Sequence, residues 1–482
     1  MVQGLRVLYL AAEATPLIKV GGLADVAGEL PRALRGLGHD VLLTVPLHPP
    51  VDTAGVCILR STRLQIPTSR GLLEATAHLG TLGGQEVLLI DGEPIRAAPG
   101  VYADAEANGR KFGFFSIAAL EACRAMEWRT DVVHANDWHT GPAIYWLSEH
   151  RAADGFWRTA ATILTVHNLG FMGAGSEAAL SLMNLEPATD PLLPDWARSL
   201  PLPVALLTAD WLTAVSPTYA REIRTPEFGF GLEALLEGRA GRLEGILNGI
   251  DPAGWEPSSD PVLPHRFSGE DLGRRALNRE ALRAEFELPL EPSIPLLAMV
   301  TRLDSQKGVD LALSALESLA SERWQFILLG TGDPDLERRA RVFADEHWTR
   351  ARAVLHFDAA LSRRIYGGAD MLLVPSRYEP CGLAQLIAMR YGCIPVVRAT
   401  GGLKDTVRDD SGSEGTGFTF RQASPDDLAD AILRAVAAFA DRRRWEALQR
   451  RAMATDYSWR RSAEDYAALY QRAVKARRAE FR

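Results

Sequence analysis

Short apolar runs recur along this chain, and each is followed by a stretch long enough for an amphipathic helix. The runs are continuous rather than alternating with polar residues, which is typical of parallel strands covered by helices on both faces. Such alternation of strand and helix predicts open α/β sheets of the doubly wound type. The runs lie at 6–13, 40–46, 86–91, 131–137, 160–168 and 211–217, and again at 295–303, 325–332, 353–358, 370–376 and 393–400.

The length of 482 residues predicts two domains, because a single hydrophobic core stops growing well before that size. The segment "LNGIDPAGWEPSSDPVLPHRF" is rich in Pro, Gly and Ser and has no periodicity, so we expect the join there. We predict one α/β domain over 1–248 and a second over 249–455. Aromatic and apolar residues at helical spacing in 456–482 predict a final helix that packs on a neighbouring element.

The composition argues against several classes of protein. A net charge of -8 gives no general basic field, so we expect no nucleic-acid partner. The N-terminal apolar run is too short to span a bilayer, and we find no signal or transit peptide. The four cysteines lack metal-type spacing and suit a reducing compartment. We therefore expect a cytoplasmic protein without a membrane partner.

Polar groups that follow the strands are the candidate functional residues, because ligands of open α/β sheets bind outside the carboxyl ends of the strands. After the first strand, "IKVGGLADV" places Lys19 beside Gly21 and Gly22 at the start of a helix. The glycines let backbone N–H groups approach a ligand, and the helix end and the lysine both favour an anion. The loop therefore fits a diphosphate, or it is a tight turn with a surface lysine.

Two loops of the second half also suit an anion. "MVTRLDSQKGVDLAL" places Arg302 and Lys307 between a strand and a helix, where Arg can hold a phosphate through two hydrogen bonds. In "PSRYEPCGLAQL", Glu379 follows a strand, and a helix opens at Gly382 and Leu383. One strand later, "TGGLKDT" repeats the Gly-Gly-Leu-x-Asp pattern of the first loop and supplies Gly402.

Two strands of the first half end in polar groups. "DVVHANDWHTG" offers His134, Asn136, Asp137 and His139, but side chains that alternate between the faces of a strand do not converge on zinc. We therefore expect no metal site. "TILTVHNLG" ends a strand with His167, and this position favours a functional over a structural histidine.

Taken together, the motifs resemble those of bacterial glycogen synthases and plant starch synthases, which are retaining glycosyltransferases that elongate α-1,4-glucan. The likeness runs nearly from end to end. The motifs that carry it are "KVGGLADV", "HANDWHTG", "TVHNLGFMG", "TAVSPTYAREI", "FGFGLEALL", "GILNGID", "TRLDSQKG", "PSRYEPCGLAQLIAMRYG" and "TGGLKDTV". The resemblance implies a GT-B fold, in which two doubly wound Rossmann-like domains face a central cleft and the last helix crosses back to the first domain.

The same resemblance implies ADP-glucose as donor, an α-1,4-glucan such as glycogen as acceptor, and no cofactor or metal. The family's catalytic and pocket residues correspond here to His167, Glu379, Asp137, Arg302 and Lys307. The donor-binding positions correspond to Lys19, Gly21, Gly22, Asn248, Arg302, Lys307, Tyr366, Gly382, Leu383 and Gly402, with Tyr366 where the family packs adenine. We expect the cations of both domains to meet the diphosphate.

One stretch departs from the family pattern. Before "TADWLTAVSP" the family usually has a "FLKAG"-like run, whereas this chain has "RSLPLPVALL", and the preceding part of 176–206 is also atypical. This departure bears on contacts with the acceptor rather than on the donor motifs. A related glycosyltransferase that uses UDP-glucose or a small acceptor, and a non-catalytic protein that binds glucan or nucleotide sugar, are the alternative interpretations.

Overall fold

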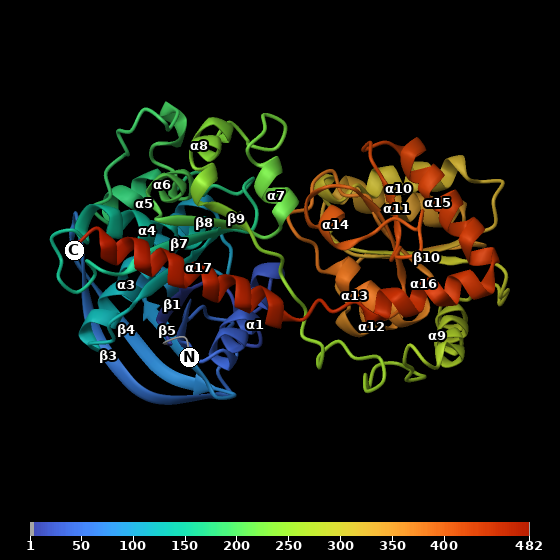
Figure 1. The fold of residues 1–482 in the computed structure, drawn as a ribbon, viewed down its shortest axis with the longest axis horizontal. Helices are drawn as coiled ribbons and strands as arrows, with labels where there is room; N and C mark the ends of the chain where they lie inside the picture. The colour runs from blue at the N-terminus through green and yellow to red at the C-terminus, as the bar shows by residue number, and fades with distance from the viewer. Residues whose placement is uncertain (1–3, 482) are drawn as a thin grey trace. The chain divides into compact units, whose positions relative to one another are not determined.

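A computed structural model describes residues 4–481. The chain forms two compact units (Figure 1). The first unit runs up to Asn248 and resumes at Trp459, and the second spans Gly249–Ser458. The last helix of the chain therefore belongs to the first unit. Within 4–481, no helix is both long and apolar enough to cross a membrane.

The first unit is built on a nine-stranded sheet with the order β3-β4-β5-β2-β1-β6-β7-β8-β9. From β5 to β9 all neighbours are parallel, whereas β3 and β4 form an antiparallel extension (Figure 1). Its strands are β1 Arg6–Leu10, β2 Asp40–Pro46, β3 Val56–Thr68, β4 Gly71–Leu82, β5 Gln85–Gly92, β6 Val132–Asn136, β7 Ala161–Val166, β8 Trp211–Ala214 and β9 Leu243–Gly245.

Helices cover both faces of this sheet, because alternate strand residues point to opposite sides. Val7 and Tyr9 of β1 pack in one apolar cluster with side chains of α1 and α17, while Leu8 and Leu10 are buried outside that cluster. The helices of this unit are α1 Gly22–Gly36, α2 Glu93–Arg96, α3 Ala105–Ala125, α4 Asp137–His150, α5 Glu177–Leu182, α6 Pro201–Thr208, α7 Pro217–Glu222, α8 Glu233–Gly238 and α17 Trp459–Ala479.

The second unit has a six-stranded, all-parallel sheet with the order β12-β11-β10-β13-β14-β15. Counted within the unit, this is the 3-2-1-4-5-6 order of Rossmann folds. The strands are β10 Leu296–Val300, β11 Gln325–Leu329, β12 Ala351–Val354, β13 Met371–Val374, β14 Ile394–Arg398 and β15 Phe418–Phe420.

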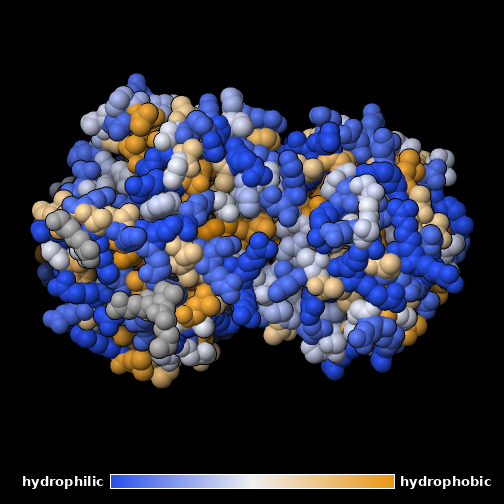
Figure 2. Space-filling model, viewed as in Figure 1, coloured by the Kyte–Doolittle hydropathy of each residue, from blue (hydrophilic) through white to orange (hydrophobic). Residues whose placement is uncertain are grey.

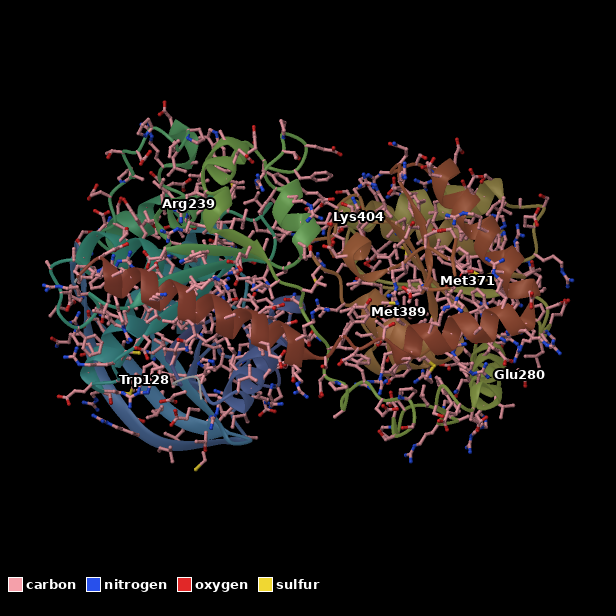
Figure 3. All side chains as sticks on the ribbon, viewed as in Figure 1. Trp128, Arg239, Glu280, Met371, Met389 and Lys404 are labelled. Carbon is pink, nitrogen blue, oxygen red and sulfur yellow. The ribbon has the colours of Figure 1, made fainter. Side chains whose placement is uncertain are left out.

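Helices lie on both sides of the second sheet, with α10 and α15 on one side and α12, α13 and α16 on the other (Figure 1). Met371 of β13 and Met389 of α13 belong to its core, whereas Glu280 of α9 is exposed (Figure 3). The helices are α9 Leu272–Glu285, α10 Val309–Ser318, α11 Pro334–Glu346, α12 Ala359–Gly368, α13 Ala384–Arg390, α14 Gly401–Thr406, α15 Pro425–Ala440 and α16 Arg442–Ala454. The face seen in Figure 2 is largely hydrophilic, with apolar residues in scattered patches.

The predicted parallel strands are confirmed in both units. The antiparallel hairpin of β3 and β4 was not predicted, because its residues do not form continuous apolar runs. Residues of β3 such as Arg63 and Gln65 are exposed and alternate with buried Leu64 and Ile66. β15 was also missed, because it has only three residues.

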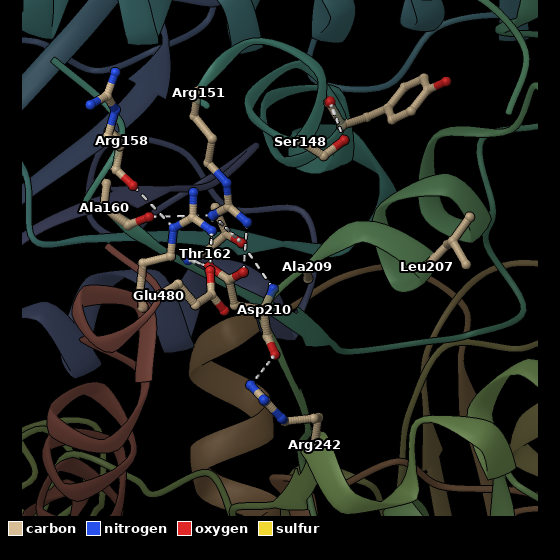
Figure 4. A network of polar contacts seen from close by, with 12 residues as sticks. Ser148, Arg151, Arg158, Ala160, Thr162, Leu207, Ala209, Asp210, Arg242 and Glu480 are labelled. Atoms are coloured by element: carbon tan, nitrogen blue, oxygen red, sulfur yellow. Dashed lines mark hydrogen bonds and ion pairs between the residues drawn. The ribbon is translucent and has the colours of Figure 1, made fainter. Parts of the chain in front are cut away.

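An ion pair ties α4 to the start of β8 in the first unit (Figure 4). Arg151 follows α4, and its Nη1 and Nη2 donate to the two carboxylate oxygens of Asp210 at 2.7 and 2.6 Å. The backbone N–H of Thr162 also donates to Asp210, at 2.8 Å. The side chains of Arg151 and Asp210 are only 9% and 16% exposed. Removing the arginine therefore leaves a nearly buried carboxylate without its partner.

We predict that Arg151→Ala lowers the free energy of unfolding by about 3 kcal/mol, as expected for a broken buried ion pair. Arg460→Ala is the control, because Arg460 pairs with Glu464 on α17 with side chains that are 83% and 53% exposed. This control should change stability by less than about 0.5 kcal/mol. Urea denaturation of the wild type and both variants measures the difference, and equal effects of the two substitutions would contradict the prediction.

Candidate functional site in the two units

Among the parallel strands of each sheet, the strand order reverses direction once, and several of the candidate residues lie at these points. In the first sheet the reversal falls between β1 and β6, and in the second between β10 and β13. The connections that leave two such strands run in opposite directions, so a crevice opens at the carboxyl ends of the strands. Lys19 follows β1 and Asp137 follows β6, while Lys307 follows β10 and Glu379 follows β13.

The loop after β1 is held by a carboxylate that the sequence analysis did not single out. Glu13 is 1% exposed, and its Oε2 accepts hydrogen bonds from the N–H groups of Val20 and Gly21 at 2.5 and 3.0 Å. The N–H of Gly21, predicted to approach a ligand, is therefore already bonded within the protein. Gly22 begins α1. Lys19 is half-exposed, and its Nζ donates to Asp25 on the first turn of α1 at 2.7 Å.

Asp137 and His167 are brought together at the ends of β6 and β7. Asp137 has a φ of 56°, and its Oδ1 accepts from the backbone N–H groups of His167 and Asn168 at 2.7 and 3.3 Å. Burial raises the pKa of Asp137 to about 7, even though these two hydrogen bonds favour the charged form. Asp137 therefore changes its charge near neutral pH.

The imidazole of His167 is neutral at neutral pH and has a defined tautomer. Burial lowers the pKa of His167 to about 3. Its Nε2 lies 2.8 Å from Oδ1 of Asn136, whose Nδ2 donates to the carbonyl of Leu10 at 2.8 Å. Since the amide of Asn136 presents its oxygen to the ring, Nε2 carries the proton and Nδ1 is an acceptor. His167 therefore does not act as a cationic acid.

His134 and Asn248, two other polar candidates of the first unit, differ in their hydrogen bonds. Both ring nitrogens of His134 are bonded within the core, to the Tyr470 hydroxyl at 2.7 Å and to the Thr165 hydroxyl at 2.6 Å. His134 therefore anchors α17 to the sheet. Asn248 is 6% exposed, and within 4–481 no donor reaches its Oδ1. A buried acceptor without a donor is what a ligand hydroxyl would satisfy.

In the second unit, Lys307 and Glu379 form an ion pair. Nζ of Lys307 donates to Oε2 of Glu379 at 2.7 Å, and the Ser376 hydroxyl donates to the same oxygen at 2.9 Å. The side chains of Lys307 and Glu379 are 18% and 7% exposed. This pair joins the loop after β10 to the loop after β13, so two of the predicted site residues are in direct contact.

The candidates Gly402, Gly382 and Leu383 lie in or against the loop that carries Glu379. The N–H of Gly402 donates to the carbonyl of Glu379 at 3.0 Å. Gly382 adopts a φ of +74°, and Leu383 caps the N-terminus of α13, where the first amides have no acceptor one turn earlier. Arg302 is separate from the ion pair of Glu379. Its side chain is 59% exposed and lies 3.3 Å from Asp304, so its guanidinium remains accessible to solvent.

The predicted contact between Tyr366 and adenine is contradicted by the structure. Tyr366 is 4% exposed and lies in the core of the second unit, with its ring near those of Trp255 and Tyr391. Its place on α12 turns the side chain inward rather than toward a ligand. The role of Tyr366 was implied by the family resemblance, which did not indicate that its side chain is buried.

Two features of the first unit were missed or left open by the sequence. Glu13 could have been found from the sequence, because it is a carboxylate that follows a buried strand. The atypical segment 176–206 forms α5, a 3₁₀ turn at Asp195–Ala197 and the first part of α6. Pro201 and Pro203 lie at the start of α6, where a missing N–H costs no helical hydrogen bond. Among the described residues, no group of three or more His, Cys, Asp or Glu side chains could hold a metal ion.

Comparisons with known proteins agree with this architecture. Residues 6–238 match the family model of the starch synthase catalytic domain, and residues 279–451 match that of glycosyl transferases group 1. The catalytic domain of starch synthase IV from Arabidopsis thaliana, bound to ADP and acarbose, superposes with a TM-score of 0.91 at 34% identity, over 98% of this chain and 100% of that one. Sucrose-phosphate synthase from Thermosynechococcus elongatus, at 20% identity and a TM-score of 0.62, shares the fold.

The fold and these matches define a glycosyltransferase of the GT-B class. Curated relatives narrow the class further. The glycogen synthase of Syntrophotalea carbinolica is 40% identical over 98% of this chain and 100% of its own length. That of Moorella thermoacetica is 38% identical, covering 98% of both chains. The chain belongs to the bacterial glycogen synthase family.

We predict that Asp137→Asn changes how stability depends on pH. The native pKa of about 7 lies above the ordinary value of 3.8, so the native state retains a proton that the unfolded state has lost between these values. Wild-type stability should therefore fall as pH rises through this window and level off above it. Asparagine removes this titration and also tolerates the positive φ.

The stability difference, wild type minus variant, should decrease by on the order of 4 kcal/mol between pH 4 and pH 8, at about 1.4 kcal/mol per pKa unit. Urea denaturation at closely spaced pH values measures this difference. A difference that stays constant with pH would show that Asp137 does not titrate in this range.

Proposed function

We propose that this glycosyltransferase transfers glucose from ADP-glucose to the non-reducing end of an α-1,4-glucan such as glycogen, with retention of configuration and without a metal or cofactor. The observation that carries the proposal is the Lys307–Glu379 pair at the strand reversal of a Rossmann sheet, beside the N-terminus of α13. Full-length similarity to bacterial glycogen synthases supports the acceptor, and the ADP and acarbose bound to the starch synthase support the donor and the glucan. The buried thiols of Cys123, Cys381 and Cys393 suit a cytoplasmic location.

Glucosyl transfer develops positive charge on the sugar while negative charge grows on the departing diphosphate. Fixed cations and helix N-termini stabilise such charge best where water is excluded. We assign this task to Arg302, Lys307 and Lys19, together with the amides of Gly382 and Leu383. Arg302 is the more accessible cation of the second unit, while Lys307 is held in place by Glu379.

The hydrogen bonds already formed within the protein indicate which atoms remain available to bind the sugar. Ser376 and Lys307 both donate to Oε2 of Glu379. We propose that Oε1 accepts a hydrogen bond from a sugar hydroxyl. His167 contributes its backbone carbonyl or its neutral Nδ1 to the transferred glucose, since its ring is not protonated near neutral pH. We also assign polar contacts with the transferred glucose to Asp137 and Asn248. We propose front-face attack, in which the acceptor hydroxyl loses its proton to the leaving phosphate.

The decisive test of this proposal is transfer of radiolabelled glucose to glycogen from ADP-glucose and from UDP-glucose, measured side by side. We expect faster transfer from ADP-glucose, with release of ADP only when glycogen is present. Preference for UDP-glucose would support a related GT-B enzyme instead. Absence of transfer from either donor would support a binding protein, and a glucosyl adduct trapped on Glu379 or Asp137 would contradict front-face attack.

We predict that Lys307→Ala lowers kcat by about 100-fold or more, because a cation that stabilises the leaving group acts mainly in the transition state. The loss also leaves the carboxylate of Glu379 without its counter-charge. Steady-state kinetics with ADP-glucose measure kcat and KM separately. Lys475→Ala, an exposed lysine of α17, is the control and should retain normal kinetics. An unchanged kcat with only a raised KM would contradict the assigned role.

A further inference from the structure

Glu13 has no role in the proposed mechanism, yet it organises the loop that carries Lys19. The carboxylate is 1% exposed and lies just after β1. Its Oε2 accepts from the N–H groups of Val20 and Gly21 at 2.5 and 3.0 Å. Its Oε1 accepts from the Tyr102 hydroxyl at 3.1 Å and from the same Gly21 N–H at 3.2 Å. Three donors thus converge on one buried carboxylate.

These bonds determine the course of the chain between Lys19 and α1. Burying a carboxylate is costly unless hydrogen bonds compensate for the lost water, and here the loop itself supplies two of the three donors. A Cβ atom added at Gly21 would lie 3.3 Å from Oε1, so glycine lets the loop close tightly over the carboxylate. On the other side, Asp25 of α1 holds Nζ of Lys19 at 2.7 Å. The loop is therefore anchored at both ends.

We infer that Glu13 is a positioning residue for donor binding. It takes up the amides of Val20 and Gly21, so that the loop is preformed and presents Lys19 and the N-terminus of α1 to the donor diphosphate. The carboxylate acts through the loop and does not itself contact the donor. This inference rests on the proposed function, because it assigns the loop to the donor. Burial raises the pKa of Glu13, whereas the hydrogen bonds from these donors favour its charged form.

Substitutions at position 13 should affect the donor and spare the acceptor. Glu13→Gln keeps the length of the side chain but has a single acceptor oxygen, and Glu13→Asp is too short to reach both amides. Residues that orient the ligands of metal sites typically contribute about 10- to 100-fold, and we expect an effect of the same order for a carboxylate that orients a loop. We expect Glu13→Gln to raise the KM for ADP-glucose about tenfold without changing the KM for glycogen. Glu13→Asp should be impaired at least as much.

The test is a double-mutant cycle between Glu13 and Lys19, run on the full-length enzyme. If Glu13 acts by positioning Lys19, then Lys19→Ala should reduce kcat/KM for ADP-glucose much less in the Glu13→Gln background than in the wild type. Glu106→Gln, an exposed carboxylate of α3, is the matched control and should leave the effect of Lys19→Ala unchanged. Thermal denaturation of each variant identifies any loss of folded protein.

A Lys19→Ala effect of equal size in both backgrounds would overturn the inference, as would a normal KM for ADP-glucose in Glu13→Gln. A fall in activity that matches the loss of folded enzyme, with unchanged KM values, would also overturn it and leave Glu13 a structural role only. If the wild type transferred glucose from another nucleotide donor, the proposed donor would be wrong, and the same cycle with that donor would still decide the role of Glu13.

Discussion

Among the parallel strands of each sheet, the strand order reverses direction at one point, and this reversal positions the candidate site. At β1 and β6, and again at β10 and β13, successive connections leave in opposite directions. A crevice therefore opens at the carboxyl ends of these strands, where polar groups such as Lys307 and Glu379 are placed. Each sheet is stabilised by apolar residues on both faces, while each site is built from residues that follow the last buried position of a strand.

The carboxylates near the candidate sites of the two units are held in different ways. In the first unit, Glu13 and Asp137 are buried and accept hydrogen bonds from backbone N–H groups. Burial raises the pKa values of both carboxyls, although these hydrogen bonds favour the charged form. The second unit pairs its carboxylate with a cation, Lys307 with Glu379, across two loops. Groups held in this way need little reorganisation when charge develops on a substrate, which is the physical basis of electrostatic catalysis. Family membership shows a glycosyltransferase, and the arrangement of these groups supports the proposed mechanism.

Much of the fold could be predicted, because strands buried on both faces need continuous apolar runs and those runs are visible in the sequence. The hairpin of β3 and β4 was missed for the opposite reason, since one of its faces carries exposed polar residues such as Arg63 and Gln65. Position after a strand was enough to nominate Asp137, His167, Lys307 and Glu379. Position along the chain was not enough to assign a role to residues that lie within a helix. Tyr366 was assigned to the donor, but the packing of α12 turns it into the core.

Apolar periodicity and the order of motifs are local properties of the chain, and they were enough to predict the family, the two Rossmann-like sheets and the loops that carry the candidate site residues. Which groups are paired and which are charged depends on contacts that form only when the chain folds. Glu13 binds N–H groups seven and eight residues away, Lys307 binds a carboxylate 72 residues away, and His167 takes its tautomer from Asn136. Burial and these contacts set protonation and orientation, and neither is written in the spacing of residues along the chain.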